Sequence, residues 1–258
     1  MTALLQVDRL NKRFGGLHAV RDVSFSLEAG TITGVLGPNG AGKTTIFNLL
    51  TGFIPLDSGT VHLDGHPLGG LAAHRVVNLG LARTFQLARP FMGMTVLENV
   101  EVPCLAPRVR HAGHPRARAQ ALLAQVGLAD KAELLVDVLP YGDLRRLEIA
   151  RALATRPKLL LLDEPFAGLG AAEIDPLAAL IRCLHRSEGL TILIIEHKLR
   201  EFMQLVETVI AMDFGEIIAI GDPATIVRHP RVVEAYLGKA ELDLLCNAPK
   251  AGAGDGTA

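Results

Sequence analysis

The stretch GPNGAGKTT, residues 37–45, limits what this chain can fold into more than any other part of the sequence. It fits the pattern G-x-x-x-x-G-K-[S/T] and lies between an apolar run, residues 31–37, and a helical pattern that begins near Lys43. In that context the backbone folds around an anion with its N–H groups turned inward. We predict a nucleotide phosphate site, rather than a glycine-rich turn with an exposed lysine, made of Gly37, Pro38, Asn39, Gly40, Ala41, Gly42, Lys43, Thr44 and Thr45.

Two more apolar runs predict a parallel sheet. KLLLLD, residues 158–163, and TILIIE, residues 191–196, are apolar on both faces, as buried parallel strands are. Helical patterns begin after them, near Ala171 and Lys198. Strands that alternate with helices in this way are typical of an α/β fold.

Other segments predict an antiparallel layer and a helical insertion. TVHLDG at 60–65 is one candidate strand, and VIAMD and EIIAIG form a pair joined by Phe214–Gly215, a turn so short that it joins only antiparallel strands. We expect these strands to form a small β-layer beside the main sheet. Residues 91–157 show helical patterns and no convincing strand, which indicates a helical insertion between core strands.

Length and composition narrow the class of protein. The chain has 258 residues, which suits one large domain or two intimate ones, and 49% of them are hydrophobic. With 26 basic and 27 acidic residues, its net charge of −1 gives no electrostatic basis for binding nucleic acid. The apolar runs fall far short of the roughly 20 residues of a membrane span, so we expect any membrane role to need a partner. Residues 241–258, rich in Gly and Ala, are predicted to be a flexible tail.

Two carboxylates follow the apolar strand at 159–162. Asp163 is placed to hold Mg²⁺ through water, together with the Thr44 hydroxyl, while Lys43 reaches the β- and γ-phosphates. Glu164 is a candidate general base for an attacking water. Two ordinary loop acids are the alternative, which the phosphate loop disfavours. A GTPase would carry D-x-x-G here and N-K-x-D later, and neither occurs in a fitting place.

Three further side chains are candidate contacts of the nucleotide. His197 follows a core strand and would point into the crevice where nucleotides bind, beside the γ-phosphate and the attacking water. Gln86 ends the predicted strand GLARTFQ and would touch both the metal-bound water and the helical insertion. Phe14 would stack on adenine, a contact worth about 1–3 kcal/mol for a base on an aromatic ring. Each has a simpler alternative. His197 could be an ordinary histidine at the sheet edge, Gln86 a polar residue that merely ends a strand, and Phe14 a core residue.

The turn LPYGD at 139–143 precedes a helical pattern. The amino end of a helix offers unpaired N–H groups and the positive end of the helix dipole. From the residues alone, two interpretations stay open. The turn is either a helix cap or a site for a phosphate that another molecule holds.

In this order, the motifs resemble the ATP-binding subunit of an ABC transporter over residues 1 to about 238. The resemblance implies a P-loop NTPase fold, with a RecA-like parallel core, an antiparallel β subdomain and a helical insertion. It also implies an ATP-binding domain at 1–240, divided into a core at 1–90 and 158–240 and a helical subdomain at 91–157.

Four stretches narrow the resemblance to the LivG-type subunits of branched-chain amino acid importers: TFQ…PFMGMTVLENV, RRLEIARALATRPKLLLLDEP, IIEHKL and RVVEAYLG. Importers of urea, short amides or aromatic acids share much of this pattern. The resemblance implies a peripheral ATPase on the cytoplasmic face of the inner membrane, which uses ATP and Mg²⁺ to drive import through permease subunits. A second ATP-binding subunit, identical or paralogous, and indirectly a solute-binding protein are the other implied partners.

In this family the turn at 139–143 is the signature loop, normally L-S-G-G-Q, which binds the γ-phosphate held by the opposite subunit of a head-to-tail pair. The resemblance therefore assigns nucleotide contacts to Tyr141, Gly142 and Asp143. The signature serine and glutamine are replaced by Pro140 and Asp143, and the D-loop aspartate position holds Gly170. Because Pro140 has neither a hydroxyl nor an N–H for a phosphate, we expect a weaker trans contact.

Two other functions compete with an import ATPase. A regulatory module that binds ATP but hydrolyses it weakly is favoured by Pro140 and Gly170. A soluble ABC protein acting on DNA or ribosomes would need tandem sites, zinc cysteines or a long coiled coil, and the sequence has none. The ATPase prediction assigns catalysis to Glu164, His197 and Gln86, and metal contacts to Thr44, Gln86 and Asp163.

Overall fold

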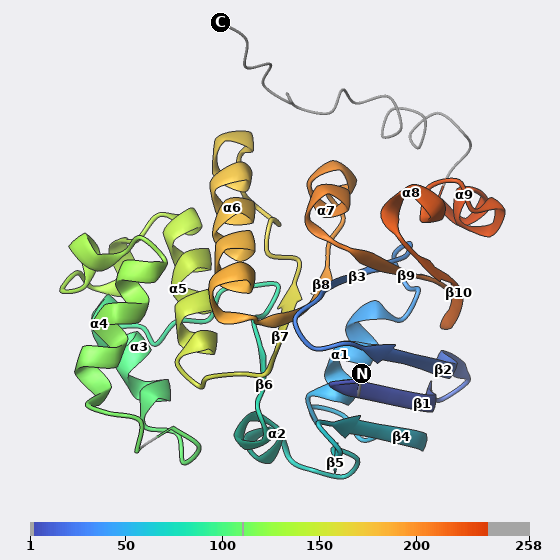
Figure 1. Cartoon of the computed structure of the whole chain (residues 1–258), viewed down its shortest axis with the longest axis horizontal. Helices are drawn as coiled ribbons and strands as arrows, with labels where there is room; N and C mark the ends of the chain where they lie inside the picture. Colours follow the sequence, from blue (N-terminus) through green and yellow to red (C-terminus); the bar gives the residue numbers. More distant parts are fainter. Residues whose placement is uncertain (1–2, 110, 237–258) are drawn as a thin grey trace, which may run out of the picture.

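The computed structural model describes residues 3–109 and 111–236. Its largest element is a six-stranded sheet with the strand order β10-β9-β3-β8-β7-β6 (Figure 1). Three of these strands, β3, β7 and β8, are buried along their whole length, as in a parallel sheet covered on both faces. The predicted α/β fold is therefore confirmed. The six strands are β3 (Ile32–Leu36), β6 (Leu81–Arg83), β7 (Leu159–Asp163), β8 (Thr191–Ile195), β9 (Thr208–Asp213) and β10 (Glu216–Gly221).

The parallel pairing brings separate parts of the chain to one edge of this sheet. β3 lies between β8 and β9, and β7 lies between β8 and β6, all in parallel register. The carboxyl ends of these five strands consequently share one edge. The loops that begin at Gly37, Thr84, Glu164 and Glu196 all leave the sheet there.

Helices follow the central strands, as their sequence patterns predict: α1 (Lys43–Leu50), α6 (Ala171–Glu188) and α7 (Leu199–Leu205). Helix α7 packs closely on β3, because a Cβ added to Gly34 would lie 2.2 Å from Phe202 Cζ. Glycine at this position of the strand makes that approach possible. Two short helices, α8 (Pro223–Ile226) and α9 (Pro230–Tyr236), end the described part of the chain.

A second, antiparallel sheet has the order β2-β1-β4-β5. Leu5 of β1 stands opposite both Leu27 of β2 and Leu63 of β4, and all three leucines are buried. They share one apolar core with Phe47 of α1 and with side chains of β3, β7 and β8, so α1 packs between the two sheets. The strands are β1 (Leu5–Phe14), β2 (Leu17–Leu27), β4 (Ser58–Leu63) and β5 (His66–Pro67).

The place predicted for the hairpin β9–β10 was wrong. Its strands are antiparallel and joined at Phe214–Gly215, as expected, but they extend the main sheet instead of the separate layer. The reason is that β9 pairs in parallel with β3, where Thr33 stands opposite Thr208. An antiparallel edge strand on an otherwise parallel sheet is a common arrangement.

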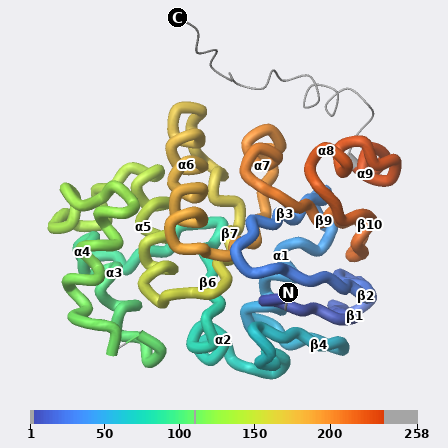
Figure 2. Tube along the Cα trace, in the orientation of Figure 1, coloured from blue at the N-terminus to red at the C-terminus, as the bar shows by residue number. Residues whose placement is uncertain are grey.

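The helical part of the chain lies to one side of the main sheet, away from β1, β2 and β4 (Figure 2). Its helices are α3 (Val96–Cys104), α4 (Pro115–Gln125) and α5 (Tyr141–Leu153), with short 3₁₀ turns at Ala129–Lys131 and Val136–Val138. Thr95 and Glu98 form a reciprocal capping box that starts α3, and Pro115 stands at the first turn of α4. Between residues 91 and 157, leaving Arg110 aside, only an isolated bridge from Thr95 to Leu135 has strand pairing.

The segment before this helical part also differs from the prediction. Helix α2 (Ala73–Leu79) leads into β6, which ends at Arg83. Gln86 was predicted to end that strand, but it lies three residues beyond it in a loop. The parallel partner β7 bonds β6 only up to Thr84, whose N–H donates to Leu161 O, and the chain then turns away.

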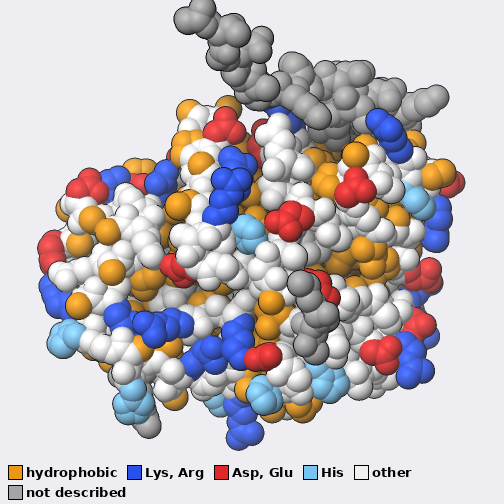
Figure 3. Space-filling model, viewed as in Figure 1, with side chains coloured by type: hydrophobic (Ala, Val, Ile, Leu, Met, Phe, Trp, Pro, Cys, Tyr) orange, Lys and Arg blue, Asp and Glu red, His pale blue; other side chains and the backbone are white. Residues whose placement is uncertain are grey.

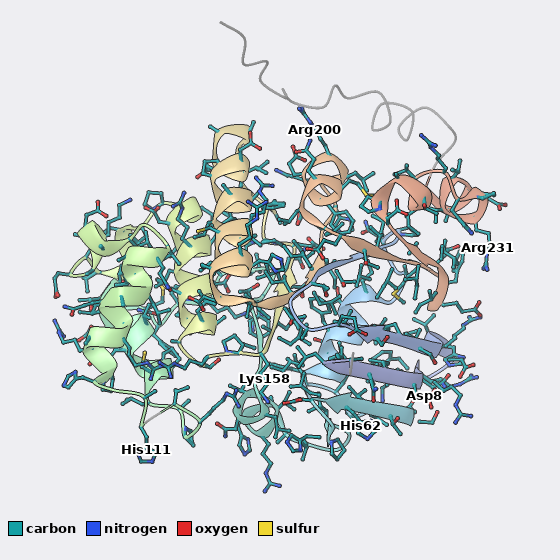
Figure 4. All side chains as sticks on the ribbon, in the orientation of Figure 1. Asp8, His62, His111, Lys158, Arg200 and Arg231 are labelled. Carbon is teal, nitrogen blue, oxygen red and sulfur yellow. The ribbon has the colours of Figure 1, made fainter. Side chains whose placement is uncertain are left out.

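Lys158, labelled in Figure 4, pairs with Asp64 in the turn between β4 and β5, which ties the start of β7 to the antiparallel sheet. Within residues 3–109 and 111–236, the structure contains no helix that is long and apolar enough to cross a membrane. The predicted tail, residues 241–258, lies outside the described residues.

Candidate active site

The loop between β3 and α1 has the backbone shape that its glycines predict. Gly40 and Gly42 have φ values of 85° and 98°, which L side chains rarely adopt. A Cβ on Gly42 would also lie 2.5 Å from Ala19 O, so only glycine fits between the loop and β2. The turn Phe214–Gly215 also supports the loop, since Gly215 N–H donates to Ala41 O at 3.1 Å.

Lys43, at the start of α1, is a buried cation at the mouth of this loop. Its Nζ donates to Gly37 O at 2.5 Å and to Pro38 O at 2.9 Å. Burial lowers the pKa of Lys43, and the nearby Glu164 and Asp163 act in the opposite direction. Both carboxylates at the end of β7 therefore lie within electrostatic reach of the phosphate loop.

Asp163, the last residue of β7, is almost fully buried and ion-paired. Arg83 Nη2 donates to its Oδ2 at 2.6 Å, and the two side chains are 5% and 3% exposed. Thr44, in contrast, is exposed on α1. Among the residues that the structure describes, no group of three or more His, Cys, Asp and Glu side chains could hold a metal ion.

Glu164 joins the other two predicted catalytic residues. Gln86 Nε2 donates to Glu164 Oε2 at 2.7 Å, and His197 Nε2 lies 3.0 Å from Glu164 Oε1. Glu164 has a φ of 48°, and its N–H donates to Ile195 O at 2.9 Å, which fixes its backbone against the end of β8. The structure thus brings together three residues from three loops, and the carboxylate between them is only 14% exposed.

Glu196 is a second acid at this edge, which the sequence did not single out. It is 1% exposed, and it accepts a long hydrogen bond of 3.5 Å from Phe166 N–H. Burial raises the pKa of Glu196 to about 7, and Glu164 adds to the rise, while backbone N–H groups of Phe166, Lys198 and His197 oppose it. Lys198 in turn donates to Leu169 O at 3.0 Å, so the loops after β7 and β8 are linked.

Phe14 is the last residue of β1, in the antiparallel sheet. Its ring is 48% exposed, and Lys12 Nζ lies 5.6 Å from the ring centroid. An exposed ring at the end of the antiparallel sheet is available for stacking. The alternative of a core phenylalanine does not hold.

The amino end of α5 is built differently. Pro140 is the N-cap residue and provides no side-chain hydrogen bond to the helix. Asp143 pairs with Lys131, and Arg145 lies 5.0 Å from the centroid of the Tyr141 ring. Gly142 faces Glu173, whose Oε1 would lie 2.4 Å from a Cβ at position 142. The partners come from the helical part, as with Lys131, and from α6, as with Glu173. None of the contacts described joins residues 141–143 to the loop at 37–45.

Comparison with known proteins decides the family to which this site belongs. The family model described as "ABC transporter" matches residues 20–167. This chain belongs to the ABC transporter ATP-binding subunits. A second model, described as "Branched-chain amino acid ATP-binding cassette transporter", matches residues 216–241.

Individual ABC subunits resemble the chain over nearly their whole length. The high-affinity branched-chain amino acid transport ATP-binding protein BraF of Pseudomonas aeruginosa is 40% identical over 251 residues, which cover 92% of this chain and 98% of BraF. LivG of Salmonella typhimurium is 41% identical with the same coverage. A crystal structure of an ABC transporter's ATP-binding cassette in its ADP conformation has a TM-score of 0.84 at 30% identity, covering 93% of this chain and all of the other.

The predicted ABC ATPase class is confirmed, but the sequence did not indicate every residue at the sheet edge. Arg83 and Glu196 were missed. Arg83 stands at the end of a short strand, where an arginine is as often exposed, and its partner Asp163 is distant in sequence. The pattern IIEH did offer a signal for Glu196, because a charged residue directly after a fully apolar strand is placed at the crowded end of the sheet.

Proposed function

We propose that ATP binds to the loop at 37–45 and that Glu164 is the general base for its hydrolysis. The observation that carries this proposal is the pair of hydrogen bonds from Gln86 and His197, which hold both oxygens of the Glu164 carboxylate. A base held on both sides has one orientation toward a water placed beside the γ-phosphate. Lys43 supplies the cation for the phosphates, and Phe14 stacks on the adenine.

The proposed magnesium contacts are Asp163, Thr44 and Gln86. All three carry oxygen atoms, the ligands that Mg²⁺ prefers, and Gln86 uses its amide nitrogen on Glu164, which leaves the amide oxygen for this role. With so few protein ligands, the ion would be shared with the phosphates of the nucleotide, as is usual in ATPases. When bound, magnesium would neutralise charge that develops on the phosphates.

We further propose that the chain serves a branched-chain amino acid importer at the cytoplasmic face of the inner membrane. The functions for which BraF and LivG are named, and the family model that matches residues 216–241, support this proposal. The partners would be permease subunits, a second ATP-binding subunit and, indirectly, a solute-binding protein. Basic, acidic and hydrophobic side chains are interspersed on the face drawn in Figure 3, which fits a protein partner better than nucleic acid.

A hollow between the core and the helical part is the proposed permease site. It has a volume of about 330 Å³ and is lined in part by Phe85, Arg89 and Phe91 of the loop after β6 and by Glu148 and Arg151 of α5. The segments around it expose hydrophobic side chains, namely Leu87, Met92 and Leu105. A permease segment seated there would contact the loop that carries Gln86. The core at 1–90 and 158–240 and the helical subdomain at 91–157 would then move relative to each other.

A regulatory subunit with weak hydrolysis is the second candidate. It is favoured by the amino end of α5, where Pro140 offers no N–H or hydroxyl and Asp143 is paired with Lys131. Gly170 also stands where the family has an aspartate. The intact group of Gln86, Glu164 and His197 argues for the ATPase.

Steady-state ATP hydrolysis by the purified chain, with and without its co-purified permease, separates these two functions. We expect magnesium-dependent turnover that the permease stimulates. ATP binding without turnover in either preparation would favour the regulatory subunit and contradict the ATPase.

A further inference from the structure

Arg83 connects three elements that carry the proposed ATP site. It is the last residue of β6, and its Nη2 donates to Asp163 Oδ2 at the end of β7. Its Nη1 donates to Asn48 Oδ1 on α1 at 2.6 Å. A single guanidinium therefore links the proposed magnesium carboxylate to the helix that follows the phosphate loop.

Aromatic rings set the orientation of this guanidinium. The ring centroids of Phe47, Phe53 and Phe85 lie 5.5, 6.0 and 5.1 Å from Arg83 Cζ. Phe53 and Phe85 also meet edge to face, 5.5 Å apart. Arg83 Nε is buried and has no hydrogen-bond partner among the described residues. The hydrogen bonds described for this guanidinium are therefore donated by Nη1 and Nη2. The planar fork is held in one plane and cannot leave Asp163 without disturbing the rings.

The stability of the fold does not by itself explain why an ion pair of Arg83 and Asp163 is buried here. Taking an arginine and an aspartate out of water costs about as much as their attraction returns, and apolar residues of similar volume often serve a core as well. The place of Asp163 gives a specific reason. Asp163 lies within electrostatic reach of Lys43 in the phosphate loop, and under the proposed function its orientation would decide where a metal-bound water is held.

We propose that Arg83 is a positioning residue for magnesium binding. It occupies Asp163 Oδ2 and thereby presents Oδ1 to the metal side of the site. This inference rests on the proposed ATPase function and adds a residue to it. Arg83 also stands three residues before Gln86, so the segment 83–86 holds both neighbouring acids, Asp163 through Arg83 and Glu164 through Gln86.

The test measures what magnesium adds to ATP binding. The dissociation constant of ATP is measured on the purified full chain in EDTA and in excess MgCl₂. The readout is the ratio of the two, the value in EDTA divided by the value in MgCl₂. In Arg83→Met the ratio should fall about fivefold or more, because methionine fills the volume but cannot hold the carboxylate. Affinity in EDTA should stay within about twofold of wild type, since the phosphate loop is untouched.

Three other variants make the test specific. Arg83→Lys should restore part of the lost ratio, because a cation returns without the planar fork. Asn48→Ala should lower the ratio less than Arg83→Met, since it loosens Arg83 without removing its charge. Arg118→Met is the matched control. Arg118 donates to carbonyl groups of Cys104, Val109 and Ala154 in the helical part, and its loss should leave the ratio unchanged.

The outcomes distinguish failure of this inference from failure of the proposed ATPase function. A wild-type ratio in a folded Arg83→Met protein would overturn the inference. If that variant does not fold, an unchanged ratio in both Arg83→Lys and Asn48→Ala overturns it instead. A wild-type chain that binds no ATP, or binds it equally with and without magnesium, would overturn the proposed function and this inference with it.

Discussion

The carboxyl edge of the main sheet and the amino end of α5 both offer groups suited to phosphate, but they are assembled in opposite ways. At the sheet edge, Gln86, Glu164 and His197 come from three loops and bond to one another. At the amino end of α5, Asp143 pairs with Lys131 and Gly142 is crowded by Glu173. The side chains of the first group bond to one another, whereas the residues of the second contact Lys131 and Glu173, which belong to other elements.

This difference indicates which phosphate contacts a single chain can make and which need a second subunit. Parallel strands collect residues from distant parts of the sequence at one edge, so one chain by itself brings Gln86, Glu164 and His197 together. The amino end of α5 has N–H groups and a dipole, and no contact among the described residues joins it to the phosphate loop at 37–45. Under our proposal, its target is the nucleotide of a second subunit.

Glu164→Gln should give the largest effect, because it removes the proposed base from the sheet edge. The amide keeps the shape of the side chain but cannot accept a proton from water. Turnover should fall about 10²- to 10⁴-fold, the usual contribution of general-base catalysis, while ATP affinity stays near wild type. Parallel turnover and equilibrium binding assays check this. Near-normal turnover would transfer the role of base to His197.

Glu196→Gln should change how stability depends on pH. The pKa of Glu196 is raised from 4.5 to about 7, so between these pH values the folded carboxyl keeps a proton that the unfolded one has released. The folded state then binds more protons, and wild-type stability falls as pH rises through this window. Because glutamine does not ionise, the variant should lose less stability between pH 5 and 8, by up to about 3 kcal/mol. Urea unfolding at both pH values measures this, and equal losses in the two proteins would refute it.

Gly142→Asp tests the role of the amino end of α5. A carboxylate there would repel a γ-phosphate offered by a second subunit, and turnover of the assembled transporter should fall about tenfold or more. Glu173→Ala serves as the control, since any side chain at position 142 also displaces Glu173 from Gly170 N–H. Wild-type turnover in a folded Gly142→Asp protein would show that this end of the helix is only a cap and does not bind the phosphate of a second subunit.

Lys131→Met should have the smallest effect. The pair with Asp143 is partly exposed, with side chains 32% and 17% accessible, and such pairs contribute about 1 kcal/mol or less. Asp143 stays favourable in the first turn of α5 because of the helix dipole. Thermal unfolding should show a loss below about 1 kcal/mol. A larger loss would mean that this pair organises α5 as Arg83 organises the sheet edge.

How far the sequence predicts each region follows from the range of its interactions. The phosphate loop and the helix starts depend on neighbouring residues, so local patterns locate them. The hairpin β9–β10 was misplaced because strand order depends on the pairing of Thr33 with Thr208, which no local pattern carries. Gln86 was placed at a strand end because an apolar pattern does not show where the partner β7 stops bonding.

Arg83, at the candidate site, was also missed because its contacts are distant in sequence. Its burial comes from Asp163, Asn48 and three aromatic rings, contributed by α1, β7 and the loops after α1 and β6. Sequence patterns indicated Asp163, Glu164, Gln86 and His197 one by one, but neither Arg83 nor Glu196. The ion pair that holds one of them in place appears only after the strands are paired.

The most direct test of this account is the ATP affinity of the isolated chain in two variants, Lys43→Ala and Gly142→Asp, at low protein concentration. If the sheet edge is complete within one chain, Lys43→Ala should weaken ATP binding about tenfold or more, because a hydrogen bond to a charged phosphate contributes roughly 1.5–3 kcal/mol. Gly142→Asp should match wild type within about twofold, since α5 acts on another subunit's nucleotide. Equal loss of affinity in both variants, or normal affinity in Lys43→Ala, would contradict the account.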